Sequence, residues 1–216
     1  MSIWRTTSFQ QWYAAQREAG NELVAARPEW MFTVGQGFVF CWALQVSIWI
    51  AAEQRVKENE VVIGRPDVSA VLMYRRNRPI GDTVIVLVRE FRSPGRTKDG
   101  YIHELPGGSS FKPVADPMQL ATDECREETG LEIEPTRLRA HGVRQVAGTT
   151  TSHAAALFSV ELTEGEVAWL HAQRGLARGC LEDTERTHVE VTTLAAIRSA
   201  PLTDWGMLGM ILEVLA

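Results

Sequence analysis

One predicted helix, bounded at both ends by strong local signals, constrains this chain more than any other feature. Asp116 is a typical N-cap residue, and Pro117 suits the first helical position because its fixed φ matches a helix. Gly130 stands where a left-handed residue commonly ends a helix. These signals predict a helix over residues 117–129, directly after a loop that is rich in glycine and proline.

Three carboxylates share one face of this predicted helix. Glu124, Glu127 and Glu128 stand at positions i, i+3 and i+4, and residues at these spacings are neighbours on a helix surface. Like charges at this density repel one another unless a cation lies between them, and carboxylates are ligands for Mg²⁺ and Mn²⁺. The alternative is an acidic face in solvent, since charged side chains are mostly exposed. The spacing alone leaves both interpretations open.

Short segments rich in Val, Ile and Thr predict β-strands on both sides of this helix. They cover residues 58–63, 69–74, 83–88, 133–146, 153–162 and 188–192. Two further helices are predicted. One begins at the capping-box sequence that follows Thr163 and runs towards Gly175, and the other carries an apolar stripe from Met207 to Val214 near the end of the chain.

The N-terminal part contains a long apolar run at residues 31–52, close to the roughly 20 residues that a transmembrane helix requires. Gln36 and Gln45 interrupt the run, and its Phe, Val, Trp and Ile content favours strands. We therefore predict buried or interfacial strands here, with a membrane span as the alternative. Residues 1–27 lack a cationic start followed by an apolar stretch, so no targeting peptide is predicted.

The residues around the glutamate helix resemble the Nudix box. Residues 123–131 place the three helix glutamates, a glycine and an aliphatic residue in the register of that family, and residues 104–108 are similar to the ELPAG or ELPGG segment that precedes its box. The resemblance implies an α+β Nudix fold, in which α-helices sandwich a mixed β-sheet, over residues 65–216. Residues 1–64 then form a β-rich N-terminal extension, which contributes to dimerisation in the related branch.

Two positions depart from the Nudix box. Asp123 stands where the family has an arginine, and the first box glutamate falls at Ala115. Those two side chains usually form an ion pair that holds the loop against the helix. Because both are missing together, no buried charge is left without its partner, and Asp116 is expected to hold the turn as the N-cap. The altered box also fits a protein that binds a nucleotide without cleaving it.

Nudix enzymes use divalent cations to hydrolyse a nucleoside diphosphate that is linked to another group. The resemblance implies Mg²⁺, with Mn²⁺ also possible, bound by Glu124, Glu128 and the backbone carbonyl of Gly107. It implies that Glu127 binds a second ion or orients a water molecule. A metal is needed on physical grounds as well, since a site lined only by carboxylates repels an anionic diphosphate.

The strand before the box points to one branch of the family. Residues 88–92 resemble the "QYR…P" strand end of ADP-ribose pyrophosphatases, whose arginine contacts phosphate, and Arg92 is the corresponding residue. By the same resemblance Arg65 binds the nucleotide, with an arginine in a solvated turn as the alternative. Glu104 is expected to contact ribose or to hold an arginine. A proline that this branch often carries after the box is missing, which leaves nucleotide sugars open beside ADP-ribose.

An acidic segment at residues 179–190 precedes the predicted strand at 188–192. The resemblance implies a water-activating glutamate at this point, and Glu182 and Glu185 are the candidates for this general base. A charged loop in solvent is the alternative. His153 is a lone histidine at the start of an apolar strand, and we interpret it as structural.

Charge and cysteine content bear on partners and compartment. The chain has 22 Lys plus Arg against 27 Asp plus Glu, a formal net charge of −5, so no basic field attracts nucleic acid or anionic membranes. Its 3 cysteines fit neither a disulfide framework nor a zinc site, which favours a reducing cytoplasm. Together with the resemblance, this predicts a cytoplasmic homodimer that hydrolyses a small nucleotide substrate, without nucleic-acid or membrane partners.

Overall fold

The computed structural model describes residues 2–35, 37–110, 116–179 and 185–216, and its elements separate into two compact units. The first unit contains Met1–Val68, Ser109–Ala115 and Arg144–Ala155. The second contains Ser69–Gly108, Asp116–Val143 and Ala156–Ala216. Two later segments of the chain thus belong to the same unit as the N-terminal residues.

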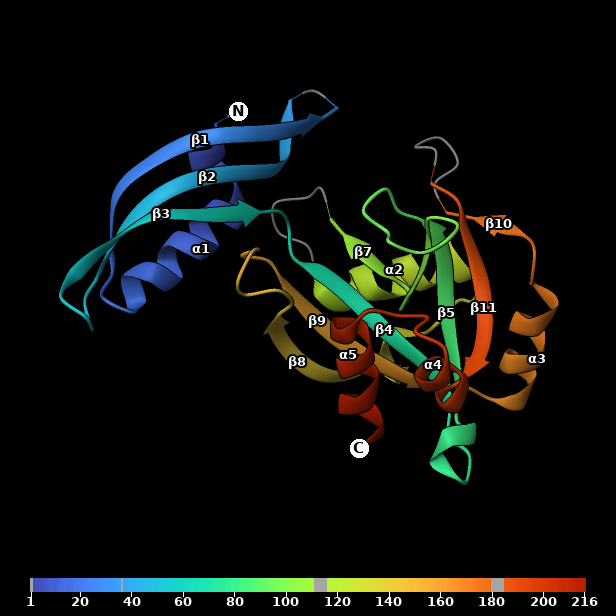
Figure 1. The fold of residues 1–216 in the computed structure, drawn as a ribbon. Helices are drawn as coiled ribbons and strands as arrows, with labels where there is room; N and C mark the ends of the chain where they lie inside the picture. The colour runs from blue at the N-terminus through green and yellow to red at the C-terminus, as the bar shows by residue number, and fades with distance from the viewer. Residues whose placement is uncertain (1, 36, 111–115, 180–184) are drawn as a thin grey trace. The chain divides into compact units, whose positions relative to one another are not determined.

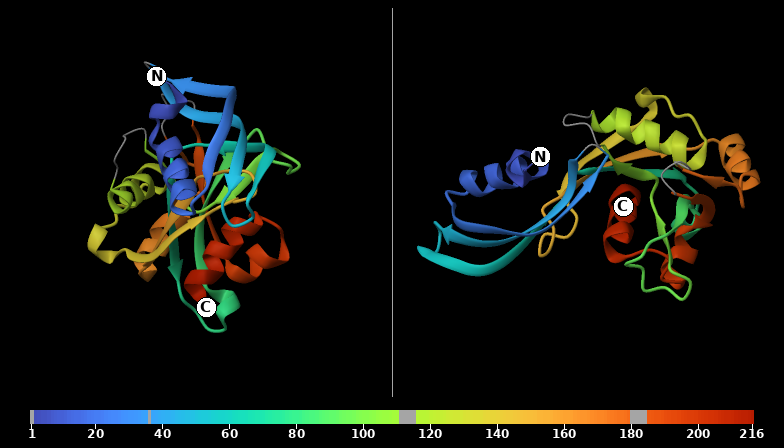
Figure 2. Two further views of the ribbon diagram at one scale, coloured as in Figure 1. Left: turned by 90° about the vertical axis from the view of Figure 1, so that its left-hand side faces the viewer. Right: turned by 90° about the horizontal axis from the view of Figure 1, so that it is seen from above.

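The first unit is a three-stranded antiparallel sheet with a helix on one face (Figures 1 and 2). Its elements are η1 (Ile3–Arg5), α1 (Thr7–Glu18), β1 (Glu22–Val34), β2 (Phe38–Ile50) and β3 (Arg55–Gly64). The apolar run at 31–52 lies mostly in the hairpin of β1 and β2, so the predicted strands are confirmed, and alternate residues of β2 are buried as expected, whereas Met31 and Phe32 of β1 are exposed. No helix among the described residues has the length and apolar character needed to cross a membrane. Sequence patterns did not predict α1.

Alternation along β2 holds α1 on this sheet. Trp42, Leu44 and Val46 are buried from the same side of β2, where they form one cluster with Phe9 of α1. The indole N–H of Trp42 donates a hydrogen bond of 2.9 Å to Ser8 Oγ, also on α1. The helix is therefore fixed by contacts with a strand more than 30 residues away, which explains why local sequence signals alone do not reveal it.

The second unit is built around a larger sheet that lies between two pairs of helices (Figures 1 and 2). Its strands are β4 (Val68–Arg75), β5 (Val84–Phe91), β6 (Tyr101–Glu104), β7 (Gly107–Ser109), β8 (Arg139–Gln145), β9 (Ala154–Glu161), β10 (Ala177–Arg178) and β11 (Thr187–Thr193). Its helices are α2 (Pro117–Thr129), α3 (Glu164–Ala172), α4 (Leu194–Ser199) and α5 (Trp205–Leu215), with 3₁₀ turns η2 (Ile80–Asp82) and η3 (Pro135–Arg137). The strand order is β10-β11-β5-β4-β9-β8, with β6 paired to β5 and β7 paired to β4.

Two apolar clusters fill the two faces of this sheet. On one face Cys125 of α2 and Leu170 of α3 cluster with Val86 of β5, and on the other Ile211 of α5 clusters with Leu87 of β5. Strand β5 supplies both clusters because successive side chains of a strand point to opposite faces. The α+β class predicted from the sequence is confirmed.

The predicted boundaries of the glutamate helix are confirmed at both ends. Helix α2 spans Pro117–Thr129, Asp116 Oδ1 accepts a hydrogen bond of 3.0 Å from the Met118 N–H, and Gly130 is left-handed with φ 76°. Helix α5 covers the predicted apolar stripe near the C-terminus. The strand predicted over 133–146 is wrong at its start, because Pro135 opens the turn η3 and β8 begins only at Arg139.

The capping box of α3 gives a prediction about stability and pH. Arg137 Nη1 donates a hydrogen bond of 2.6 Å to Glu166 Oε1, and this contact, with the bonds from Thr163, lowers the pKa of Glu166 to about 2. We expect Glu166→Gln to lower the unfolding free energy by about 1 kcal/mol at pH 7. Because the pKa of Glu166 is lower in the folded state, this carboxylate stabilises the fold at pH values above the pKa of about 4.3 that it has in the unfolded chain. The difference in unfolding free energy between wild type and variant therefore shrinks as the pH falls towards 2.

Urea titrations at several pH values between 7 and 3 would measure this difference. Glu132→Gln is the matched control, since Glu132 is an exposed carboxylate in the loop after α2. A difference that stays constant with pH, or one that the control reproduces, would contradict the assignment of the effect to the Glu166 carboxylate.

Candidate metal centre

The glutamate face of α2 turns towards the sheet of its own unit. Glu128 is only 3% exposed and Glu124 is partly buried, whereas Glu127 is exposed. Cys125, one residue after Glu124, is fully buried in the core between α2 and the sheet. An acidic face in solvent is therefore the wrong interpretation for Glu124 and Glu128, and it holds only for Glu127.

The glycine-rich segment lies close to the β4 backbone at Gly107 and close to the Glu124 side chain of α2 at Gly108. A Cβ at Gly107 would lie 2.2 Å from the Ser69 carbonyl oxygen, and a Cβ at Gly108 would lie 2.3 Å from Glu124 Oε1. The Gly107 N–H donates a hydrogen bond of 2.8 Å to Glu128 Oε2. The loop thus brings a backbone donor to a buried carboxylate, which glycine permits because it has no side chain.

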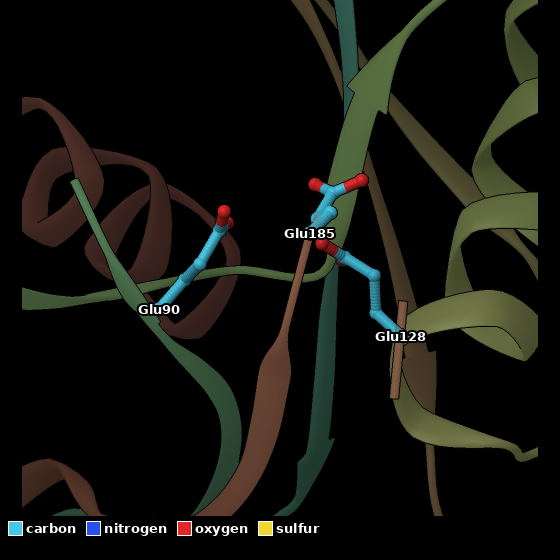
Figure 3. Close-up of side chains that lie close together, drawn as sticks. All are labelled: Glu90, Glu128 and Glu185. Carbon is cyan, nitrogen blue, oxygen red and sulfur yellow. The ribbon is translucent and has the colours of Figure 1, made fainter. Parts of the chain in front are cut away.

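Three carboxyl groups from separate elements converge beside this loop. Glu90 at the end of β5, Glu128 of α2 and Glu185 in the segment before β11 have carboxylate oxygens that all lie within 4.8 Å of one another. Figure 3 shows the three side chains lying close together, each from a different element. Glu90 is 7% exposed, and Glu185 is the member of the group with intermediate burial.

This arrangement fits a hard divalent cation. Oxygens bound to one Mg²⁺ lie about 2.1 Å from it, so two on opposite sides of the ion are about 4.2 Å apart. The observed limit of 4.8 Å needs only a small closure of side chains to reach that value. In addition, Glu90 Oε2 is buried, and its described cationic neighbour is Arg92, whose Nη2 lies 2.8 Å away without the alignment of a hydrogen bond. The donor set and the buried oxygen both suit Mg²⁺ or Mn²⁺.

The electrostatics of the group point the same way. Burial, reinforced by the nearby Glu185, raises the pKa of Glu90 to about 7, although Arg92 acts against the shift. Burial and the neighbouring Glu127 raise the pKa of Glu124 to about 7, and burial raises the pKa of Glu128 well above its usual range. The described residues therefore compensate the negative charges of Glu90, Glu124 and Glu128 only in part.

Arg92 lies at the edge of the carboxylate group and is shared by two acids. Its Nη2 is 2.8 Å from Glu90 Oε2, and its Nε donates a hydrogen bond of 3.2 Å to Glu104 Oε2. The expectation that Glu104 holds an arginine is confirmed. The Arg92 side chain remains 41% exposed, so its guanidinium is accessible to a ligand.

Arg65 belongs to the first unit, whereas the carboxylate group and Arg92 belong to the second. Its Nη2 donates a hydrogen bond of 3.0 Å to Ser109 Oγ, and its guanidinium lies 5.5 Å from the centre of the Phe40 ring. The alternative of an arginine in a solvated turn is therefore wrong. A role in nucleotide binding stays a prediction.

His153, in the same unit, is partly buried, and burial lowers its pKa.

The two departures from the box have different outcomes. Asp123 contacts its own helix: Gln119 Nε2 donates a hydrogen bond of 3.1 Å to Asp123 Oδ1, and Arg126 lies 3.9 Å away. Ala115 and the candidate base Glu182 lie outside the described residues. Asp116 holds the start of α2, as expected from the sequence.

Glu90 is the member of the group that sequence reasoning missed. Val86 and Val88 precede it at alternate positions of β5 and are buried, so the same side of the strand carries Glu90 towards α2. That alternation was a usable signal. Of the predicted ligands, Glu128 belongs to the group of three carboxylates with Glu90 and Glu185. Glu124 and Glu127 lie near Glu128 on α2 and are not members of that group.

Comparison with known proteins does not identify a relative. No protein-family model matches this chain, and no curated protein matches it. The assignment of a function therefore rests on the residues of the site.

Chelation of divalent cations should reveal the uncompensated charge of Glu124. Its raised pKa means that the folded protein holds the proton more tightly than the unfolded chain, whose value is about 4.3. With EDTA present, wild-type stability should fall as pH rises from about 4.5 to about 7. Glu124→Gln should remove about 2 kcal/mol of that fall.

Urea unfolding with EDTA, followed by the same titration with Mg²⁺, would measure the effect. Mg²⁺ is expected to stabilise the wild type more than the variant, because the cation neutralises the repelling carboxylates. Glu132→Gln again serves as the exposed control. An unchanged pH slope in Glu124→Gln would show that burial and the neighbouring acids do not raise the pKa of this carboxylate.

Proposed function

We propose that this protein is a Mg²⁺-dependent Nudix-type pyrophosphohydrolase that cleaves a nucleoside diphosphate linked to another group, with ADP-ribose or a nucleotide sugar as the substrate class. The observation that carries the proposal is the convergence of Glu128 with Glu90 and Glu185 beside the accessible Arg92. A metal-binding carboxylate group next to an arginine is suited to an anionic diphosphate, which needs positive charge on several oxygens.

The architecture of the second unit supports the same proposal. A β-sheet lies between helices, and the glutamate helix α2 follows a glycine-rich loop whose backbone contacts Glu128. Both features are what the resemblance to the Nudix box implies. They support a Nudix fold over this part of the chain.

Glu90, Glu128 and Glu185 are the residues that would hold the cation, with Glu124 beside them. A bound Mg²⁺ supplies positive charge to the diphosphate and lowers the pKa of an attacking water. Burial of Glu90 and Glu128 keeps bulk water away from this charge, which strengthens each electrostatic contact.

The other groups have separate tasks in this proposal. Arg92, oriented through Nε by Glu104, presents its remaining N–H groups to a phosphate. Glu185, already placed in the carboxylate group, is also the described candidate for general base if Glu90 and Glu128 hold the cation, since it has more access to solvent than they have. Glu127 lies exposed on the same helix, and its role in binding a second ion or orienting water stays a prediction, as do the homodimer and the cytoplasmic location.

A nucleotide sensor without turnover is the second candidate function. Among the described residues, Asp123 contacts Gln119 and Arg126 of its own helix, and no bond from it to residues 104–110 replaces the ion pair of the Nudix box. A loop that is held less firmly would leave nucleotide binding intact and lower the rate of cleavage. Turnover decides between the two candidates.

A substrate panel with Mg²⁺ tests the hydrolase. We expect release of a nucleoside monophosphate from ADP-ribose or a nucleotide sugar, detected by chromatography and abolished by EDTA. Glu128→Gln should lower kcat by at least about 100-fold, since the amide keeps the bond from Gly107 but loses the charge of a metal ligand. Arg92→Gln should raise KM, and Glu132→Gln should leave both constants near those of the wild type.

If neither the wild type nor Glu128→Gln releases a nucleoside monophosphate from any substrate of the panel while ADP-ribose still binds, the hydrolase proposal fails and the sensor is favoured. Binding by calorimetry, measured on the same samples, separates this outcome from loss of the fold.

A further inference from the structure

Glu90 takes part in two charge networks at once. Its carboxylate belongs to the group with Glu128 and Glu185, and its Oε2 also lies 2.8 Å from Arg92 Nη2. Any cation bound by the carboxylate group would therefore share an acidic ligand with Arg92. In the resemblance to the "QYR…P" strand end, Glu90 stands at the position of the glutamine, so this negative charge is a property of the present chain.

The sheet fixes the positions that make this sharing possible. Glu90 and Arg92 alternate along the same side of the chain at the end of β5, and Glu104 of β6 is paired with Val88, two residues before Glu90. On its other side β5 pairs with β11, where Thr187 lies opposite Glu90. Strand pairing therefore fixes Glu90, whereas Arg92 is the first residue after β5, where its N–H donates a hydrogen bond of 3.0 Å to the Gly100 carbonyl oxygen.

Two competitions meet at this pair. A divalent cation and the guanidinium of Arg92 can both bind the Glu90 carboxylate. Because both are positively charged, they repel each other when they bind it at the same time. In the same way, the Glu90 carboxylate and a phosphate compete for the N–H groups on Arg92 Nη2. Glu104 stands outside the group of three carboxylates and accepts a hydrogen bond of 3.2 Å from Arg92 Nε.

We propose that Glu90 is a positioning residue that couples metal binding to diphosphate binding through Arg92. Without a cation, Glu90 holds Nη2 of Arg92 and keeps it from a phosphate. When the Glu90 carboxylate binds a cation, it releases Nη2 of Arg92, which can then bind a phosphate. Arg92 keeps the orientation that Glu104 sets. The inference rests on the proposed function and predicts that metal and diphosphate favour each other's binding beyond direct contact between them.

Glu90→Gln separates the two roles, because the amide keeps the size of the side chain without its charge. Mn²⁺ titration of the full chain, followed by electron paramagnetic resonance, should show affinity lowered by about 10- to 100-fold. ADP binding in EDTA, measured by calorimetry, should become about tenfold tighter, because Arg92 is no longer held by an anion. That gain should vanish in the double variant Glu90→Gln/Arg92→Gln.

Glu104→Gln is the matched comparison, since it also removes an acid that contacts Arg92 but lies outside the carboxylate group. Its Mn²⁺ affinity should stay within about threefold of wild type. Arg92→Gln gives an independent reading and covers the case in which Glu90→Gln does not fold: its Mn²⁺ affinity should rise several-fold, because Glu90 is then no longer shared. A purely structural role of the pair would not raise metal affinity.

The proposal is overturned if Glu90→Gln folds and binds Mn²⁺ like the wild type, or binds ADP in EDTA no more tightly. It is also overturned if Arg92→Gln leaves Mn²⁺ affinity unchanged or lowers it. These readouts involve no turnover, so a chain that hydrolyses nothing but shows the expected shifts refutes the proposed function and keeps the coupling. A hydrolase without the shifts refutes the coupling alone.

Discussion

The burial of like charges is the constraint on which the second unit depends. Glu90 and Glu128 are almost completely buried and lie within reach of each other and of Glu185, although such groups repel and lose hydration. A protein tolerates this arrangement where a cation or a strong donor offsets it. The Gly107 N–H and Arg92 are donors that the described part of this unit supplies, and with them in place the pKa values of Glu90 and Glu128 are still raised.

One strand connects this charged site to the apolar core. Val86 of β5 lies in the cluster beneath α2, and Glu90 continues the same side of the strand into the carboxylate group. Packing of α2 on the sheet therefore also sets the distance between Glu90 and Glu128. The rigid elements of the core, rather than loops alone, position two of the three acids, which is what a site requires to hold a small cation closely.

Local signals in the sequence predicted those parts of the structure that depend on neighbouring residues. The ends of α2 follow from Asp116, Pro117 and Gly130, whose capping preferences act within one turn. The helix α1 was missed, because its position depends on the distant Trp42, and the start of β8 was misplaced because the turn at Pro135 was overlooked. In the site, Glu128, Arg92 and Glu185 were expected from the resemblance to the Nudix box and to the segments around it.

The sequence by itself determined that three glutamates share one face of a helix after a glycine-rich loop, because helical periodicity is a local property. Only the tertiary structure decided which of them is buried and what it meets. Glu128 turns inward to Glu90 and Glu185, while Glu127 faces solvent. Which carboxylates come together depends on strand pairing and on packing across the sheet, and both join residues that are far apart in the chain.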